Sequence, residues 1–119
     1  LYELALQQIE HNMALLRPGV SFREVTEKSW RIPDEYVARR YACLAHGVGL
    51  TGEYPHILFR EDYDEWGYDG LIHERMVLCV ESYIGAEGGR EGVKLEQPVL
   101  IGPDGPELMT GFPWEEALL

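Results

Sequence analysis

Two strand-like runs joined by a glycine-rich segment constrain the fold of this chain more than any other feature. The runs are RMVLCVESY at 75–83 and GVKLEQPVLIG at 92–102, and apolar and β-branched residues dominate both. The segment between them, IGAEGGRE at 84–91, carries the glycines that a turn between strands favours. We therefore predict an antiparallel hairpin, extended by the tight turn GPDG at 102–105 into a third strand over PELMTG at 106–111.

The first third of the chain is patterned for helices. LYELALQQIEHNMALLRPG at 1–19 carries apolar residues near helical spacing and closes with an Arg-Pro-Gly stop. Ser21 followed by Glu24 forms a capping box, which predicts a second helix over residues 22–30. PDEYVARRY at 33–41 predicts a short third helix that begins with proline.

The middle of the chain shows no sustained period. Residues 53–74 are rich in Tyr, Asp, Gly and Trp, and we predict a long loop there. Long ordered loops are often functional, so this one covers a pocket or lines a contact between copies; the equal alternative is a packed surface loop without function. Helices followed by a small antiparallel sheet place the chain in the α+β class.

Composition narrows the possible functions. A chain of 119 residues with 45% hydrophobic content is sufficient for one domain with a modest core. A formal net charge of -11 disfavours nucleic acid and anionic membrane surfaces as partners, and no apolar run approaches the roughly 20 residues of a membrane span. Two cysteines, Cys43 and Cys79, are too few for a disulfide framework, so we expect reduced thiols in a cytoplasmic protein.

The two runs of the hairpin each contain a glutamate. Side chains alternate along a strand, so Glu81 shares a face with Cys79, and Glu96 shares a face with Lys94. If the two runs pair as a hairpin, the two carboxylates can lie close together on one face. Two such anions repel and raise a pKa unless a cation lies between them.

A histidine in a glycine-flanked motif completes a candidate metal site. His46 in AHGVGL offers a nitrogen ligand, and one His with two Glu from separate strands suits a first-row transition metal. The alternative is purely structural: Glu81 as a half-exposed strand residue, Glu96 paired with Lys94, and His46 as a core histidine. Spacing alone leaves both interpretations open.

Four segments of the chain, in order, resemble the C-terminal half of the catalytic domain of the pita-bread metallopeptidases. This family includes Xaa-Pro aminopeptidases, prolidases, methionine aminopeptidases and creatinases. The segments are LLRPGVSFREV at 15–25, HGVGL at 46–50, MVLCVESYIG at 76–85 and GVKLEQPVLIGPDGPELMT at 92–110. The resemblance covers most of the chain, and it favours the metal-site interpretation.

This resemblance implies a domain arrangement and a set of ligands. Residues 1–119 would be the C-terminal portion of one pita-bread catalytic domain, and the N-terminal strands would precede Leu1. The family holds two divalent ions (Mn, Fe, Co or Zn) with five side chains. Here these would be His46, Glu81 and Glu96 together with two aspartates from the preceding strands. The resemblance thus implies an active parent protein, while residues 1–119 alone would lack a complete two-metal site and would be inactive.

The activity implied is that of a metal-dependent hydrolase of the Xaa-Pro peptidase family, with water activated on a peptide or amide bond. Peptidases of this family carry a second histidine seven residues after the motif histidine, where this chain has Glu53; His56 follows three residues later. Glu53 and His56 are therefore the candidates for proton transfer or substrate contact. The stretch HGVGLTGEYP looks more like a divergent branch that includes dimethylsulfoniopropionate lyases, which carry an acidic residue where this chain has Gly52.

Three functions follow as alternatives: the hydrolase, a lyase on the same scaffold, or a non-catalytic binding module. For either enzyme the expected partner is a short peptide or another small molecule. Strands that precede Leu1 would complete the sheet, so residues 1–119 alone are expected to expose an apolar sheet face or edge. Such a surface favours homo-oligomers.

Overall fold

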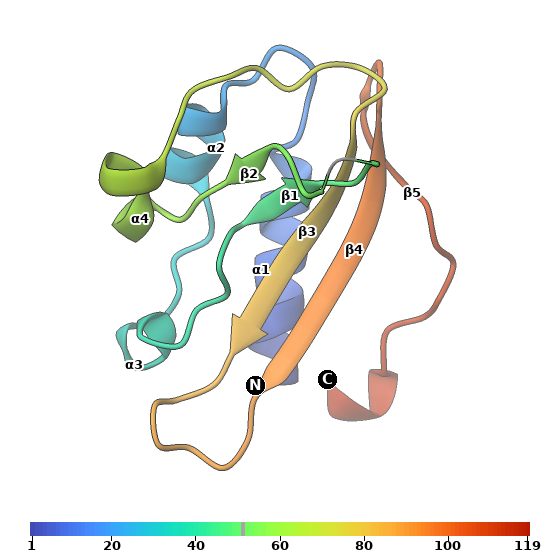
Figure 1. Ribbon diagram of the computed structural model, residues 1–119. Helices are drawn as coiled ribbons and strands as arrows, with labels where there is room; N and C mark the ends of the chain where they lie inside the picture. Colours follow the sequence, from blue (N-terminus) through green and yellow to red (C-terminus); the bar gives the residue numbers. More distant parts are fainter. Residues whose placement is uncertain (51) are drawn as a thin grey trace.

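The fold is a five-stranded antiparallel sheet with helices packed on one face (Figure 1). The structure is a computed structural model that describes residues 1–50 and 52–119. Along the chain the elements are α1 (Tyr2–Ala14), α2 (Phe22–Lys28), α3 (Asp34–Val37), β1 (Ala45–Gly47), β2 (His56–Ile57), α4 (Arg60–Trp66), β3 (Val77–Ile84), β4 (Val93–Gly102), β5 (Gly105–Leu108) and the 3-10 helix η1 (Glu116–Leu118).

The long hairpin of β3 and β4 is the centre of the sheet. The strand order is β2-β1-β3-β4-β5, and every neighbouring pair is antiparallel. The β3–β4 register runs from Val77 opposite Leu100 to Ile84 opposite Val93, which confirms the predicted hairpin. A short turn from Gly102 to Gly105 leads into β5, as the sequence predicts.

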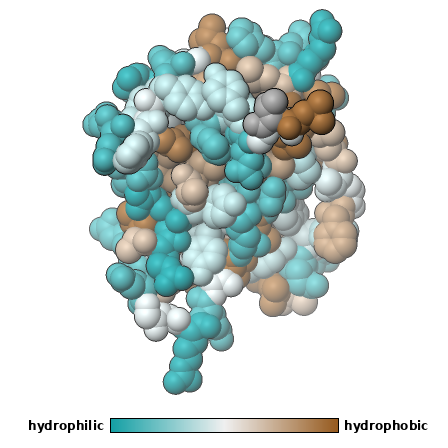
Figure 2. Space-filling view, viewed as in Figure 1, coloured by the Kyte–Doolittle hydropathy of each residue, from teal (hydrophilic) through white to brown (hydrophobic). Residues whose placement is uncertain are grey.

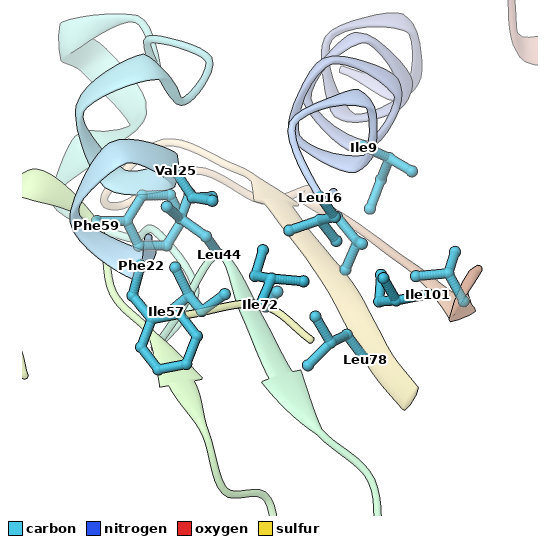
Figure 3. Packing of buried hydrophobic residues seen from close by; sticks show 13 residues of the cluster. Ile9, Leu16, Phe22, Val25, Leu44, Ile57, Phe59, Ile72, Leu78 and Ile101 are labelled. Carbon is cyan, nitrogen blue, oxygen red and sulfur yellow. The ribbon is translucent and has the colours of Figure 1, made fainter. Parts of the chain in front are cut away.

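The hydrophobic core lies between the sheet and the helices α1 and α2 (Figure 3). Each helix contributes its apolar stripe, because residues three or four apart share one face of a helix. The sheet contributes alternate side chains of its strands, since every second residue points to the same face. The cluster comprises Ile9, Leu16, Phe22, Val25, Leu44, Ala45, Ile57, Phe59, Ile72, Leu78, Val80, Val99 and Ile101.

The predicted helices are present, and the second and third are shorter than expected. Ser21 caps α2 as predicted, because its Oγ accepts a hydrogen bond of 3.0 Å from the Glu24 N–H. The Glu24 carboxylate pairs with Lys28. Helix α2 ends at Lys28 and the third helix covers only Asp34–Val37. With no buried residue of its own, α3 has little packing to extend it.

The prediction of a continuous loop over residues 53–74 is wrong. Strand β2 (His56–Ile57) and helix α4 (Arg60–Trp66) lie within this segment. Strand β2 has two residues, which is too short to show alternation, and α4 buries only Tyr63, so neither element produces a periodic pattern. Both depend on tertiary contacts with the neighbouring elements.

The face of the sheet turned away from α1 is polar. It lies in front in Figure 1, and Figure 2 shows mainly hydrophilic surface there. Of the predicted apolar sheet face or edge, this face is therefore not apolar. Apolar side chains are exposed instead in and after the edge strand β5, at Leu108, Met109 and Phe112. Within the described residues, the helices lack the combination of length and apolar character needed to cross a membrane.

Candidate metal centre

The strand register brings four potential metal ligands together on the polar face. His46 on β1 lies directly opposite Cys79 on β3, and Glu81 on β3 lies directly opposite Glu96 on β4. Residues opposite each other in an antiparallel pair project to the same face, with Cβ atoms about 4.5–5.5 Å apart. The structure thus brings His46, Glu81 and Glu96 together as the sequence predicts, although their role as metal ligands remains a prediction.

His46 is buried between two hydrogen-bond acceptors. Its Nδ1 lies 3.0 Å from the Gly47 carbonyl oxygen, and its Nε2 lies 3.1 Å from Glu81 Oε1. Burial opposes a positive charge on the ring, but the two acceptors outweigh it and raise the pKa of His46 above its ordinary value. Acceptors at both ring nitrogens favour the doubly protonated ring, and only loss of the Nε2 proton would free that nitrogen to bind a metal ion.

Glu81 and Glu96 share one cation, the ammonium of Lys94. Glu81 is only 1% exposed, and one of its carboxylate oxygens pairs with Lys94 Nζ. The same Nζ lies 3.3 Å from Glu96 Oε2 and 4.4 Å from the centroid of the Tyr41 ring. Lys94 therefore lies between the two carboxylates on the face that they share.

This lysine is the cation that offsets the repulsion between the two carboxylates, which would otherwise raise a pKa. Partial burial of Glu96 opposes its negative charge, but the Cys79 thiol and the Lys94 ammonium together lower the pKa of Glu96 below its ordinary value. The pKa of Lys94 is raised: burial opposes its charge, and the two carboxylates outweigh that effect. The sequence places Lys94 beside Glu96, but only the register shows that it reaches Glu81 as well.

Cys79 is the member of the cluster that the ligand prediction missed. Ligand atoms of His46, Cys79 and Glu96 all lie within 4.8 Å of one another. Burial, with the carboxylates of Glu96 and Glu81 nearby, raises the pKa of the Cys79 thiol to about 12. The sequence already indicates that Cys79 belongs to the cluster, because side-chain alternation places it on the same strand face as Glu81.

Glu53 and His56 lie together at the edge of this cluster. His56 on β2 is directly opposite His46, and the centroids of the two rings are 6.4 Å apart. His56 Nε2 lies 3.4 Å from Glu53 Oε2, and both side chains are exposed. The structure therefore brings an exposed Glu–His pair beside the buried ligand cluster.

A hollow adjoins the carboxylate end of the site. It has a volume of about 530 Å³, and Lys94 and Glu96 line it together with Tyr2, Phe112 and Trp114. His46 and Glu81 lie deeper in the sheet and do not line it. The hollow therefore gives small molecules access to Glu96 and Lys94.

The donor set fits a divalent transition ion. An imidazole nitrogen and carboxylate oxygens are ligands that zinc, manganese, iron and cobalt accept. The Gly47 carbonyl beside Nδ1 orients the ring so that Nε2 faces Glu81, as carbonyls beside metal-bound histidines commonly do. Two glutamates balance the charge of one such ion, so a second ion needs further carboxylates.

Residues 1–103 match the model of metallopeptidase family M24, and the chain belongs to this family. It is 41% identical over 115 residues to the dimethylsulfoniopropionate lyase DddP of Roseovarius nubinhibens, an alignment that covers 97% of this chain and 26% of the relative. For the DddP of Roseobacter denitrificans, the identity is 37% over 114 residues, with 96% of this chain and 26% of the relative covered.

A solved structure shares the fold. The prolidase from Pyrococcus horikoshii superposes with a TM-score of 0.76 at 26% identity, over 96% of this chain and 31% of that one. The pita-bread resemblance and the α+β class are thereby confirmed. The chain spans about a quarter of the length of these curated relatives (26%). Metal dependence is a property of the family as its description states.

Proposed function

We propose that the protein is a metal-dependent enzyme and that this chain supplies three of its metal ligands, His46, Glu81 and Glu96. The observation that carries the proposal is their convergence on one polar sheet face, where His46 Nε2 lies 3.1 Å from Glu81 Oε1 and the two glutamates are directly opposite each other. A buried carboxylate is costly unless it is paired, and Glu81 is paired with Lys94 and faces His46, so its burial is compatible with a role as a ligand.

The chain forms, in this proposal, the C-terminal portion of a single pita-bread catalytic domain. Its span of 26% of the curated relatives supports a longer parent protein. Two ions about 3.5–4 Å apart carry four positive charges, which Glu81 and Glu96 balance only by half. Two aspartates from strands that precede Leu1 would balance the rest.

The reaction we infer is elimination from a small sulfonium carboxylate, as in the lyases named above. The 41% identity across 97% of the chain supports this choice over hydrolysis. Glu53 stands beside His46 where the peptidases carry histidine, and an exposed carboxylate is a base. Its neighbour His56, with Nε2 at 3.4 Å, orients it and takes part in returning the proton to solvent.

The step balances without an added reactant. Glu53 removes a proton from the carbon next to the substrate carboxylate, and that electron pair forms the new double bond. The bond from the neighbouring carbon to sulfur breaks, and sulfur leaves with its electron pair as neutral dimethyl sulfide, with acrylate as the second product. A bound divalent ion supplies Lewis acidity toward the substrate carboxylate.

Hydrolysis of an Xaa-Pro peptide is the second candidate. The likeness to the prolidase, at a TM-score of 0.76, supports it. In that reaction Glu53 and His56 would move protons between water and the leaving amine. The same His46, Glu81 and Glu96 would hold the ions, so the two candidates differ in substrate rather than in ligands.

Turnover by the full-length protein separates these candidates. The protein is stripped with chelator, reloaded with manganese, iron, cobalt or zinc, and given dimethylsulfoniopropionate or an Xaa-Pro dipeptide. We expect dimethyl sulfide release, reduced at least about 100-fold in Glu53→Gln and unchanged in Glu65→Gln, an exposed α4 control. Peptide hydrolysis alone would support the second candidate. Turnover of neither substrate, in reloaded protein that binds metal, would support a non-catalytic binding module.

We also propose that the protein is a cytoplasmic homo-oligomer. Two unbridged, buried thiols, Cys43 and Cys79, support a reducing compartment. Exposed Leu108, Met109 and Phe112 beside the edge strand β5 support association. Light scattering of the full-length protein tests the proposed homo-oligomer, and a monomer that persists at high concentration would contradict it.

A further inference from the structure

Cys79 has no role in the proposed reaction, yet it occupies the centre of the ligand cluster. It lies directly opposite His46 across β1 and β3, and it is buried on the face that carries Glu81 and Glu96. Its Sγ, a nitrogen of His46 and a carboxylate oxygen of Glu96 lie within 4.8 Å of one another. Three strands therefore present sulfur, nitrogen and oxygen donors to one point.

The charges of the cluster divide into two neutral sets. The ammonium of Lys94 balances Glu81, whose other carboxylate oxygen faces His46. A Cys79 thiolate and the Glu96 carboxylate together carry two negative charges, which balance one divalent ion. Lys94 remains on Glu81 in this arrangement, and it needs only to release the longer 3.3 Å contact to Glu96.

The spacing suits a small ion with mixed ligands. Donors bound tetrahedrally to one zinc ion at about 2.0–2.3 Å lie about 3.3–3.8 Å apart. The three donors lie within 4.8 Å of one another, so binding an ion requires them to move together by at most about 1.5 Å. Glu96 and the adjoining hollow leave a side of the ion open to a small molecule.

We propose that Cys79 is a metal ligand and that His46, Cys79 and Glu96 form a site selective for a thiophilic divalent ion, zinc or cobalt, over manganese. The inference rests on the proposed function, because it shares His46 and Glu96 with that site. Thiolate donors select zinc-like ions, whereas carboxylates alone accept manganese. As the bond from Sγ to the ion forms, the thiol proton leaves to solvent.

Cobalt absorption tests the ligand directly in the full-length protein. We expect Co²⁺ to produce a thiolate-to-cobalt charge-transfer band in the near ultraviolet. The band should persist in Cys43→Ser, which removes the other buried thiol, and should disappear in Cys79→Ser. In competition titrations, Cys79→Ser should lower the preference for zinc over manganese by about 10- to 100-fold.

The outcomes separate this inference from the proposed function. Cobalt that binds, as shown by calorimetry, without a charge-transfer band in the unmodified protein overturns the role of Cys79 and leaves the three-ligand proposal intact. The role of Cys79 is also overturned, and the three-ligand proposal stays intact, if Cys79→Ser is folded by circular dichroism and keeps both the band and the zinc preference. No binding of cobalt, zinc or manganese overturns both proposals. Because the unmodified protein and Cys43→Ser report on the band by themselves, a Cys79 variant that fails to fold leaves the test decisive.

Discussion

Lys94 is the residue on which the electrostatics of the two strand glutamates depend. Its ammonium contacts both carboxylates, and it stacks over Tyr41 at 4.4 Å from the ring centroid. Without it, Glu81 and Glu96 would face each other across neighbouring strands as like charges, which is destabilising. Lys94 supplies the positive charge between these strands.

Glu96 gives this arrangement a pH dependence that can be measured. Its pKa lies below the ordinary 4.5, so the native state stabilises the charged carboxylate. The stabilisation is present above pH 4.5 and is lost as the pH falls through the native pKa. With chelator present, we expect Glu96→Gln to melt below the parent at neutral pH, and the gap to close as the pH falls through the native pKa of Glu96. Thermal melts across this range measure it.

Lys94→Met provides the control for that experiment. In this background Glu96 loses its cation, so Glu96→Gln should no longer lower the melting temperature at neutral pH. In the background with Lys94 intact, a difference in melting temperature between Glu96→Gln and the parent that stays constant or widens on acidification would show that Lys94 does not stabilise the Glu96 carboxylate.

The segment that precedes β3 contributes a residue to the hydrophobic core. Ile72 is fully buried, although it lies in no helix or strand. Its N–H donates to the Val20 carbonyl at 2.9 Å, and its carbonyl accepts from the Gly19 N–H at 2.8 Å. These bonds join the start of α2 to the segment before β3. Ile72 therefore lies in the core beneath α1 and α2 (Figure 3).

We therefore expect Ile72→Ala to lower the free energy of unfolding by about 2–5 kcal/mol, as a large-to-small core substitution does. The neighbouring Leu71→Ala is the matched control. Leu71 is 49% exposed, and its truncation should cost less than about 1 kcal/mol. Urea denaturation of the two variants measures the difference, and equal losses would place Ile72 outside the core.

For the whole molecule, the division of the sheet into an apolar and a polar face determines where chemistry is possible. The helices α1 and α2 cover one face, and the other carries the ligand cluster and mainly hydrophilic surface (Figure 2). The formal net charge of -11 adds a long-range attraction for cations. Metal binding and folding should therefore be linked.

A divalent ion that binds only the native protein should stabilise it by RT ln(1 + [L]/Kd), about 2.7 kcal/mol at a hundredfold excess over Kd. We expect zinc or cobalt to raise the melting temperature of the full-length protein, and chelator to reverse the gain. His46→Gln should remove most of the effect, whereas Glu87→Gln, exposed in the β3–β4 loop, should retain it. Stabilisation that survives in His46→Gln would place the bound ion elsewhere.

Local periodicity and turn chemistry are sufficient to predict the first three helices, the long hairpin and the face on which each strand residue lies. The motifs also indicate His46, Glu81 and Glu96. The register between strands, in contrast, depends on tertiary packing. That register places Glu81 opposite Glu96 and Cys79 opposite His46, and it brings Lys94 between the two carboxylates. Strand β2 and helix α4 likewise needed the fold, because elements so short are stabilised by their neighbours rather than by their own sequence.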